Sequence, residues 1–386
     1  MTFERDVYND EQRAFAESVA AFLRRQVASR KQEFEHDGVV ARDVYLAAGE
    51  LGILGIQIPE EYGGGGQESF LFNCAVTEQV AYERVSLGAA RVHTDVVTPY
   101  ILELANDEQR ARWLPGMASG ELMTSIAITE PGTGSDMAGI AASLKADTGG
   151  YVLNGTKTFI TGGAQSDLIV VVARSAVMPN RRDGLTLAIV EATMEGFGRG
   201  APFHKLGLKA QDTNELFFDD VWVPDENVLG DAGRAFEYLT TNLAQERLSI
   251  AVNSQAQAVA AMDLTCSYVR DRKVFGNSLG SFQNTKFVLA ELATHIAAGQ
   301  SMLDRAMRLH DRGALSPVEA AQVKLFCTEL HGRVTDACLQ LHGGYGYIWE
   351  QDICRMYADA RVARIYGGTS EVMKAIVARS LELTPR

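Results

Sequence analysis

Glu246 is the residue whose surroundings in the sequence best suit acid–base chemistry. No cation can pair with it from its own predicted helix, because the residues three and four positions away are Asn242, Leu243, Ser249 and Ile250. It also interrupts an apolar stripe made of Phe236, Leu239, Leu243 and Ile250. We therefore expect its carboxylate to face a core or a cleft, where desolvation raises a carboxyl pKa towards the range of a general base. The pattern alone fits a general base and a structural polar residue equally well.

The segment from Ile126 to Asp136 could hold a polar ligand. A short strand runs into a loop with glycines at Gly132 and Gly134 and with nearby hydroxyl groups. Backbone N–H groups in such a loop can approach a flat polar ligand or a pyrophosphate closely. An ordinary surface loop explains the same residues, and the local chemistry alone favours that explanation.

Common phosphate and metal motifs do not occur. Met137 stands where a dinucleotide-binding motif needs its third glycine, and the chain has no G-x-x-x-x-G-K-[ST] sequence. Cys327 and His331 have the i, i+4 spacing of two metal ligands, but no third ligand accompanies them, so we expect no metal site. His342 is expected to be structural, because lone histidines usually are.

Composition excludes several classes of protein. The 386 residues carry a formal net charge of −13, which disfavours a nucleic-acid partner. The longest apolar run, Leu168 to Ala173, is far short of the roughly 20 residues that span a bilayer. Neither a secretory signal nor a transit peptide is visible at the N-terminus, so we expect a cytoplasmic protein. Five scattered cysteines fit a reducing compartment.

The elements that must position these residues fall into three parts. The first part is helical, with Asp10 as a possible cap for a helix through residues 14–22. Strand-like runs follow from about residue 123 to 225, with a two-residue hairpin turn predicted at Asn154-Gly155. The third part is again helical and predicts a bundle. The sequence thus indicates an α+β protein, mostly α, in the order helices, strands, helices.

Five motifs resemble the acyl-CoA dehydrogenases, a family of FAD enzymes. They are TEPGTGSDMAG, LNGTKTFITGG, RKVFG, QLHGGYGY and IYGGTSEV, and they occur in the family's order over almost the whole chain. The resemblance implies an N-terminal helical domain over residues 1–122, a middle β-barrel-like domain over 123–228 and a C-terminal four-helix bundle over 229–386. The segments FHKLGLKAQDTNELFFDD and ERL are most similar to the long-chain members.

The resemblance also implies the residues that bind FAD. Those near the flavin ring are Ile126, Ala127, Ile128, Thr129, Gly134, Ser135, Phe159, Ile160 and Thr161. Those that reach the FAD of a neighbouring subunit are Arg272, Phe275, Gln283, Gln340, Gly343 and Gly344, with Thr369 and Glu371 returning to it from the C-terminal segment. A cofactor site shared in this way implies a homotetramer arranged as a dimer of dimers.

The resemblance assigns the catalytic base by way of a missing carboxylate. Short- and medium-chain members carry a glutamate at the position of Gly367, which has no side chain to take a proton. Long-chain and isovaleryl-type members carry it on the first long helix of the bundle, at the position of Glu246. Ser135, Arg247, Gly367 and Gly368 are expected to contact the substrate. We expect the backbone N–H of Gly367 to hold the thioester oxygen and its absent side chain to leave room for the acyl chain.

The implied reaction is α,β-dehydrogenation of an acyl-CoA thioester to a trans-2-enoyl-CoA, with electrons passed to an electron-transfer flavoprotein. An oxidase of the same fold that uses oxygen and a catalytically silent flavoprotein scaffold are the alternatives. Chain length, branching and pathway are not predicted, because they depend on a pocket whose walls come from several helices.

Overall fold

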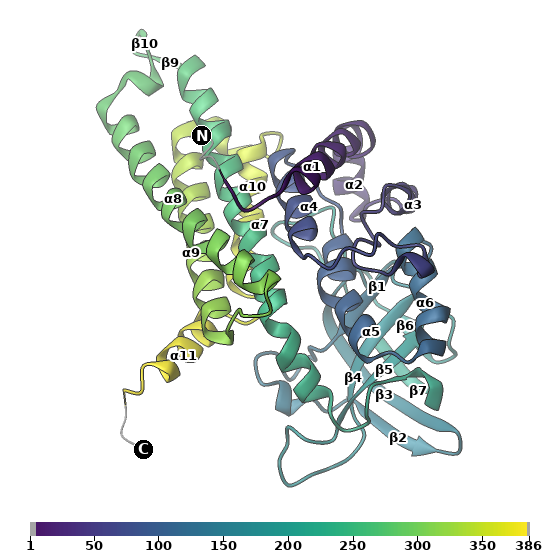
Figure 1. Cartoon of the computed structure of the whole chain (residues 1–386). Coiled ribbons are helices and arrows are strands. Elements are labelled where there is room, and N and C mark those ends of the chain that lie inside the picture. Colours follow the sequence, from purple (N-terminus) through teal and green to yellow (C-terminus); the bar gives the residue numbers. More distant parts are fainter. Residues whose placement is uncertain (1–4, 384–386) are drawn as a thin grey trace.

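Helices form at both ends of the chain and strands in its middle (Figure 1). The computed structural model describes residues 5–383. The N-terminal helices are α1 Asp10–Phe22, α2 Lys31–Asp37, α3 Arg42–Glu50, α4 Leu71–Tyr82, α5 Thr98–Leu104 and α6 Asp107–Ser119. A π-helical segment, Val92–Val97, leads directly into α5.

The predicted cap of the first helix was wrong by one residue. Asp10 is the first residue of α1, and Asn9 is its cap. The Asn9 side chain accepts a hydrogen bond from the Gln12 backbone N–H, and the Gln12 side chain accepts one from the Asn9 N–H. This reciprocal capping box satisfies two backbone donors that the first turn leaves without partners. Asp10 instead places its charge at the positive end of the helix dipole.

The middle of the chain forms an eight-stranded sheet in the order β6-β7-β3-β2-β4-β5-β8, with β1 paired to β4. The strands are β1 Thr124–Ala127, β2 Ser143–Asp147, β3 Gly150–Thr161, β4 Leu168–Arg174, β5 Leu185–Glu191, β6 Phe197–Arg199, β7 Thr213–Pro224 and β8 Val228–Leu229. Alternate residues of β4 pack into two different hydrophobic cores. Ile169 and Val171 enter the core of the sheet, whereas Val170 and Val172 pack with residues of α5, α6 and α7.

The hairpin predicted at Asn154-Gly155 does not exist. Strand β3 runs through both residues, and the turn lies earlier, where Asp147 pairs with Gly150. The pairing of β3 with β7 shifts register between Leu153 and Gly155, and Gly155 has a φ of 149°. Long antiparallel pairing therefore overrides the local turn preference, and the glycine serves a bulge instead.

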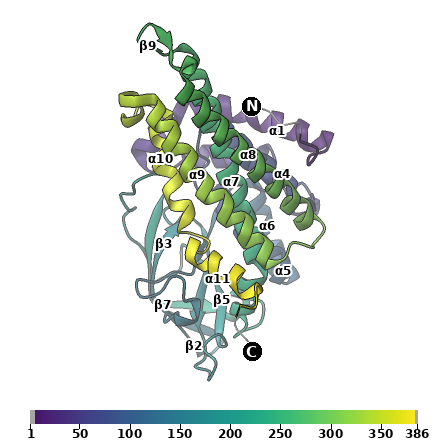
Figure 2. The same ribbon diagram turned by 90° about the vertical axis from the view of Figure 1, so that its left-hand side faces the viewer.

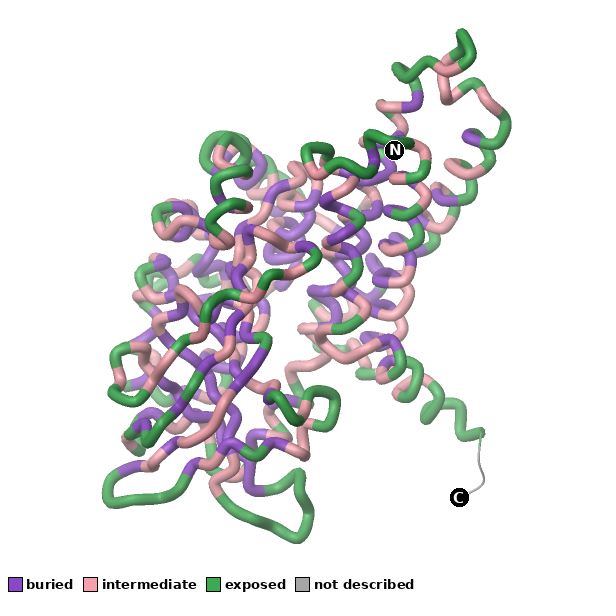
Figure 3. Tube along the Cα trace, turned by 180° about the vertical axis from the view of Figure 1, so that it is seen from behind, coloured by how far each residue is buried: buried purple, intermediate pink, exposed green. Residues whose placement is uncertain are grey.

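Three long helices form the C-terminal bundle, and shorter ones complete it (Figure 2). They are α7 Ala235–Asp271, α8 Gln283–Asp311 and α9 Pro317–His342, followed by α10 Asp352–Ala360 and α11 Ser370–Ser380. The α7–α8 connection carries a small hairpin of β9 Lys273–Val274 and β10 Asn277–Ser278. Figure 3 shows that this tip is exposed at the far end of the bundle. The predicted order of helices, strands and helices is confirmed.

Helix α7 joins the layers. Its N-terminal part packs with the sheet and α6 through Ala235 and Leu239, and its middle packs with α4 and α9 through Leu248 and Val252. Within residues 5–383, no helix is both long and apolar enough to cross a membrane.

His93 lies fully buried between the N-terminal helices and the sheet. Its ring nitrogens contact the Met117 carbonyl and the Thr124 hydroxyl, each at 3.1 Å. Desolvation lowers the pKa of His93 from 6.5 to about 4. The native state thus excludes a proton that the unfolded chain takes up below pH 6.5, so stability is complete above that pH and falls as the pH drops towards 4.

We expect protonation of His93 in the unfolded chain to lower the free energy of unfolding by about 2 kcal/mol between pH 7 and pH 5. His93→Asn should therefore make the pH dependence of stability shallower by about that amount. Denaturant unfolding at a series of pH values measures it, with the exposed His36→Asn as control. A variant with the slope of the unmodified protein would contradict this account of His93.

Candidate active site

A cleft lies between the sheet and the middle of α7. It encloses about 880 Å³ including its open mouth. The predicted site residues that line it are Ile126, Ile128, Thr129, Phe159, Ile160, Thr161, Glu246 and Gly367. Ile126 and Gly367, which are 241 positions apart in the sequence, thus share one cleft.

Glu246 lies in the wall of this cleft and is only partly accessible. The Tyr100 hydroxyl donates a hydrogen bond to its Oε1 at 3.1 Å. No ion pair to Glu246 occurs among the described residues. Desolvation raises the pKa of the Glu246 carboxyl above its usual value, although the Tyr100 hydroxyl and the charge of Arg247 act in the opposite direction. A carboxylate that is poorly solvated and has one neutral donor is suited to accept a proton.

Arg247 is buried and does not line the cleft. Its side chain is 6% exposed, which excludes the simple surface position that its type often takes. Its Nε has no hydrogen-bond partner in the described part of the chain. Its role towards Glu246 is therefore electrostatic, since its positive charge favours the ionised carboxylate.

The room expected beside Gly367 is already filled. A Cβ built on Gly367 would lie 2.2 Å from Cδ1 of Ile250 on α7. The expectation that the missing side chain leaves space for an acyl group is therefore wrong, because Ile250 occupies that space. Gly367 also has a φ of 61°, which most side chains disfavour.

A buried lysine binds the backbone of the Gly367-Gly368 pair. Lys324 on α9 is 0% exposed, and its Nζ donates to the Gly368 carbonyl at 2.6 Å. Desolvation and the repulsion from Arg247 lower the pKa of Lys324 to about 8. The bond fixes the peptide between Gly368 and Thr369, so it restrains the backbone next to Gly367.

The Phe159 ring is exposed in the cleft and is not buried, although the residue lies in strand β3. It has a φ of 59° and is 65% exposed. The register of β3 against β7 is irregular between Lys157 and Ile160, so the ring leaves the regular alternation of the strand. Its only close ring contact among the described residues is Phe203, at 5.4 Å. An exposed aromatic face next to Thr161 can stack on a flat ligand.

An ion pair anchors the loop that contains Gly132 and Gly134. Glu130 accepts hydrogen bonds from the backbone N–H groups of Ala141 and Ala142, and its Oε1 lies 2.8 Å from Nζ of Lys157. Lys157 is fully buried and also donates to the Ile128 carbonyl. Both ends of the loop are thereby held on the sheet, while Gly134 and Ser135 remain exposed. The side chain of Ala127 packs into the sheet core and does not reach the cleft.

The other predicted cofactor residues gather at the far end of the bundle. Arg272, Phe275 and Gln283 are exposed around the α7–α8 connection, and Gln340, Gly343 and Gly344 are exposed at the end of α9. Phe275 is 95% exposed, and Arg272 stacks over the Tyr345 ring. From Glu246 to Arg272 the helix rises about 39 Å, at 1.5 Å per residue. The two predicted sets therefore do not meet within one chain.

The predicted cofactor residues Thr369 and Glu371 lie at the start of α11. Thr369 caps α11 through the Val372 N–H, and Glu371 is exposed in the first turn of that helix.

No group of three or more metal-ligating side chains occurs within residues 5–383. Cys327 and His331 are both buried in the bundle. His342 donates from Nδ1 to the Cys338 carbonyl and its ring stacks on Tyr268, in keeping with a structural role.

Four supporting residues were not predicted from the sequence, namely Tyr100, Glu130, Lys157 and Lys324. Glu130 and Lys157 lie inside two of the five motifs, so their charges within largely uncharged segments could have drawn attention. Tyr100 and Lys324 have no such signal, because their partners lie 146 and 44 residues away.

Comparisons with known proteins identify a family that covers most of the chain. The chain matches the families described as acyl-CoA dehydrogenase N-terminal domain over residues 9–121, middle domain over 125–221 and C-terminal domain over 233–382. It is 41% identical over 381 residues to the long-chain specific acyl-CoA dehydrogenase, mitochondrial, of Sus scrofa, with 98% of this chain and 88% of the relative covered.

Solved structures have the same fold. The acyl-CoA dehydrogenase of Geobacillus kaustophilus superposes with a TM-score of 0.96 at 39% identity, covering 98% of this chain and all of the other. The acyl-CoA dehydrogenase complexed with FAD from Bacillus anthracis superposes with a TM-score of 0.90 at 28% identity, covering 98% of this chain and 69% of the other.

The contact between Gly367 and Ile250 predicts a coupled pair of substitutions. Gly367→Ala should cost about 2–3 kcal/mol of unfolding free energy, from the positive φ and from overpacking against Ile250. Ile250→Val removes the clashing methyl group, so Gly367→Ala should cost about 1 kcal/mol less in that background. Denaturant unfolding of the two single variants and the double variant measures the coupling. Equal costs in both backgrounds would show that Ile250 does not limit this position.

The hydrogen bond from Tyr100 predicts a shift in the titration of Glu246. Tyr100→Phe removes the one donor that favours the ionised carboxylate, so the pKa of Glu246 should rise further. The infrared carboxyl band that Glu246→Gln abolishes reports this titration directly. Tyr45→Phe, at another buried tyrosine, is the matched control and should leave the band unchanged. An unchanged titration in Tyr100→Phe would refute the assigned contact.

Proposed function

Because the chain belongs to the acyl-CoA dehydrogenase family, we propose that it oxidises the Cα–Cβ bond of an acyl-CoA thioester to a trans-2-enoyl-CoA with FAD as cofactor. The observation that carries this proposal is Glu246, a poorly solvated carboxylate without an ion-pair partner among the described residues, in the wall of the cleft. The family is one of oxidoreductases, and the FAD complex of the Bacillus anthracis relative supports the choice of cofactor.

The residues present fit FAD at two separate places. Phe159 and Thr161 offer an exposed ring and a hydroxyl in the cleft, which suit a flat ring with a polar edge. At the bundle tip, no other atom lies within 4 Å of a Cβ built on Gly343 or Gly344, and the Arg272 guanidinium is exposed nearby. Open glycine backbone and a guanidinium fork suit the phosphate half of a dinucleotide.

A complete cofactor site then requires a second copy of the chain. The two places are about 39 Å apart along α7, which is too far for one dinucleotide. Arg272 and its neighbours would complete the cleft of a partner subunit, as the resemblance implies. The exposure of Phe275 and Gly344 supports this arrangement. We propose a homotetramer arranged as a dimer of dimers.

Each residue of the cleft has a separate task in the reaction. Glu246 removes the proton from Cα. The chemistry that FAD supplies when bound is acceptance of the hydride from Cβ. The N–H of Gly367 holds the thioester oxygen as negative charge develops on it, a contribution of about 3 kcal/mol for such a donor. Lys324 holds the next residue of the chain through the Gly368 carbonyl, while Ser135 borders the substrate and Arg247 acts on the base through its charge.

The electron acceptor separates this proposal from its closest alternative. We propose an electron-transfer flavoprotein, as in the family that the motifs resemble. An oxidase of the same fold would instead reoxidise its flavin rapidly with oxygen and release peroxide. Stopped-flow reoxidation of the reduced protein by each acceptor distinguishes the two. A colourless purified protein without FAD would rule out both the dehydrogenase and the oxidase.

Glu246→Gln should retain FAD and bind substrate but lose flavin reduction by about 10³-fold or more, the size expected when a general base is removed. Anaerobic bleaching of the flavin by an acyl-CoA measures this step. Glu237→Gln, an exposed glutamate on the same helix, is the control and should reduce at the unmodified rate. Near-normal reduction in Glu246→Gln would place the base elsewhere.

A further inference from the structure

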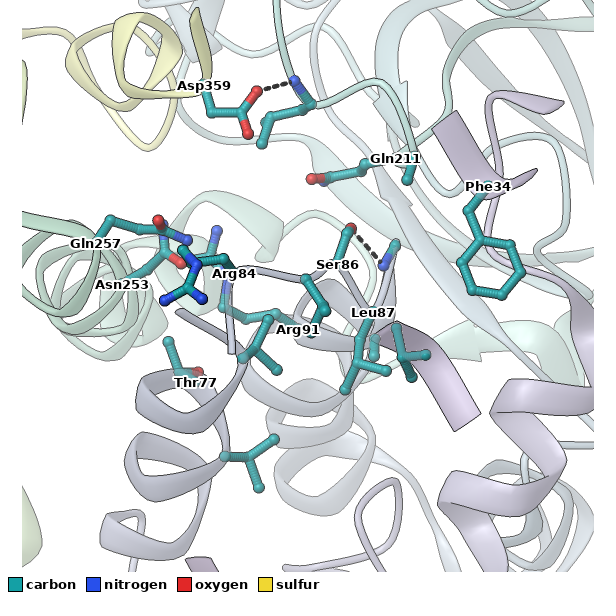
Figure 4. A pocket seen from close by; sticks show the side chains of 18 of the residues that line it. Phe34, Thr77, Arg84, Ser86, Leu87, Arg91, Gln211, Asn253, Gln257 and Asp359 are labelled. Atoms are coloured by element: carbon teal, nitrogen blue, oxygen red, sulfur yellow. Dashed lines mark hydrogen bonds between the residues drawn. The ribbon is translucent and has the colours of Figure 1, made fainter. Parts of the chain in front are cut away.

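A second cavity lies behind the cleft and shares part of its wall. Gly88, Arg91, Gln211 and Tyr366 line both spaces. The second cavity extends between α4, α7 and the loop at residues 208–211, and Figure 4 shows Asn253, Gln257 and Gln211 among the side chains that line it. An acyl chain that starts beside Glu246 would therefore pass Arg91 as it extends inwards.

Arg91 has more donors than partners at this junction. Its Nη1 donates to the Ser249 carbonyl at 3.3 Å and its Nη2 to the Tyr366 hydroxyl at 3.2 Å. A guanidinium carries five N–H donors, so three have no partner among the described residues. The two acceptors are neutral, and no described acid forms an ion pair with Arg91. Arg91 is half-buried and lines both spaces, so its free N–H groups are available to a ligand that provides acceptors.

The nearby acids do not supply these acceptors. Asp95 lies close enough for its charge to act on Arg91, but its carboxylate accepts from Asn73, Thr94 and Ser249 instead. Asp352 is held by Lys31, Arg84 and Arg355. Asp359 accepts from the Leu208 N–H. Glu35, the fourth acid of the cavity wall, pairs with Arg355, so these acids are engaged elsewhere.

Other polar groups on the cavity wall have no partners either. His331 is 2% exposed, and neither of its ring nitrogens has a hydrogen-bond partner within residues 5–383. The side-chain amides of Asn253 and Gln257, one turn apart on α7, form no hydrogen bond within the same part of the chain. A purely alkyl chain would leave all of these groups unsatisfied, which costs free energy.

From these contacts we infer that the acyl group of the substrate carries an oxygen acceptor, a carboxylate or a carbonyl oxygen, which binds the free N–H groups of Arg91. The inference rests on the proposed function and specifies its substrate class. The Ser249 carbonyl that Arg91 contacts lies about 4.5 Å beyond Glu246 along the axis of α7. Arg91 therefore contacts α7 about one turn from the base, and it determines specificity without touching the reacting atoms.

Binding to the Glu246→Gln protein loaded with FAD tests this inference without turnover. The probes are a straight-chain acyl-CoA, its ω-carboxy analogue and its oxo analogue of equal chain length, in a series of increasing lengths. Calorimetry should give dissociation constants about 10- to 100-fold lower for an oxygenated probe, the effect of a hydrogen bond to a charged group. A preference for the carboxy analogue over the oxo analogue identifies an anionic group, and equal affinities identify a neutral acceptor.

Adding Arg91→Met should abolish this preference and leave the affinity for the straight chain nearly unchanged. Arg84→Met is the matched control, because its guanidinium lines the same cavity but already pairs with Asp352, and it should keep the preference. If Arg91→Met does not fold, Arg91→Lys and the probe ratio of the parent protein decide the question. Straight-chain probes that bind as tightly as oxygenated ones would overturn the inference. That result would leave the proposed dehydrogenation intact, since the latter depends on flavin bleaching in the unmodified protein.

Discussion

The desolvation of one carboxylate is the constraint on which the rest of the site depends. Glu246 sits on the middle of α7 with a single neutral donor, the Tyr100 hydroxyl, and with its pKa raised by burial. A cation in direct contact would lower that pKa and weaken the base. The packing of α7 against α4, α5 and the sheet keeps water away, whereas buried Arg247 acts only at a distance.

Contacts with other elements also fix the backbone at Gly367 and Gly368, which lies near the base. Lys324 holds the Gly368 carbonyl from α9, and Ile250 from α7 fills the space beside Gly367. On the other side, the ion pair of Glu130 and Lys157 fixes the loop that follows β1. Both groups of contacts use buried charges, which are costly unless they are hydrogen-bonded. Their position next to the cleft indicates that they serve the geometry of the site.

The length of α7 separates the ends of the molecule that the resemblance assigns to one cofactor. A straight helix cannot bring Glu246 and Arg272 together, so the chemistry of the cleft and the exposed tip belong to different subunits in the proposed assembly. The exposed aromatic residues at the tip, Phe275 and Tyr347, are consistent with a surface that another copy covers.

Local patterns in the sequence determined the long helices, most strands and the unusual position of Glu246, because periodicity and missing helix neighbours are visible within a few residues. Tertiary structure alone decided the rest. The Asn154-Gly155 turn gave way to pairing between β3 and β7, and Gly367 proved to face Ile250 rather than empty space. Tyr100, Lys324 and the free donors of Arg91 acquire meaning only from partners on other elements, since contacts between residues far apart in the chain depend on packing and not on local preference.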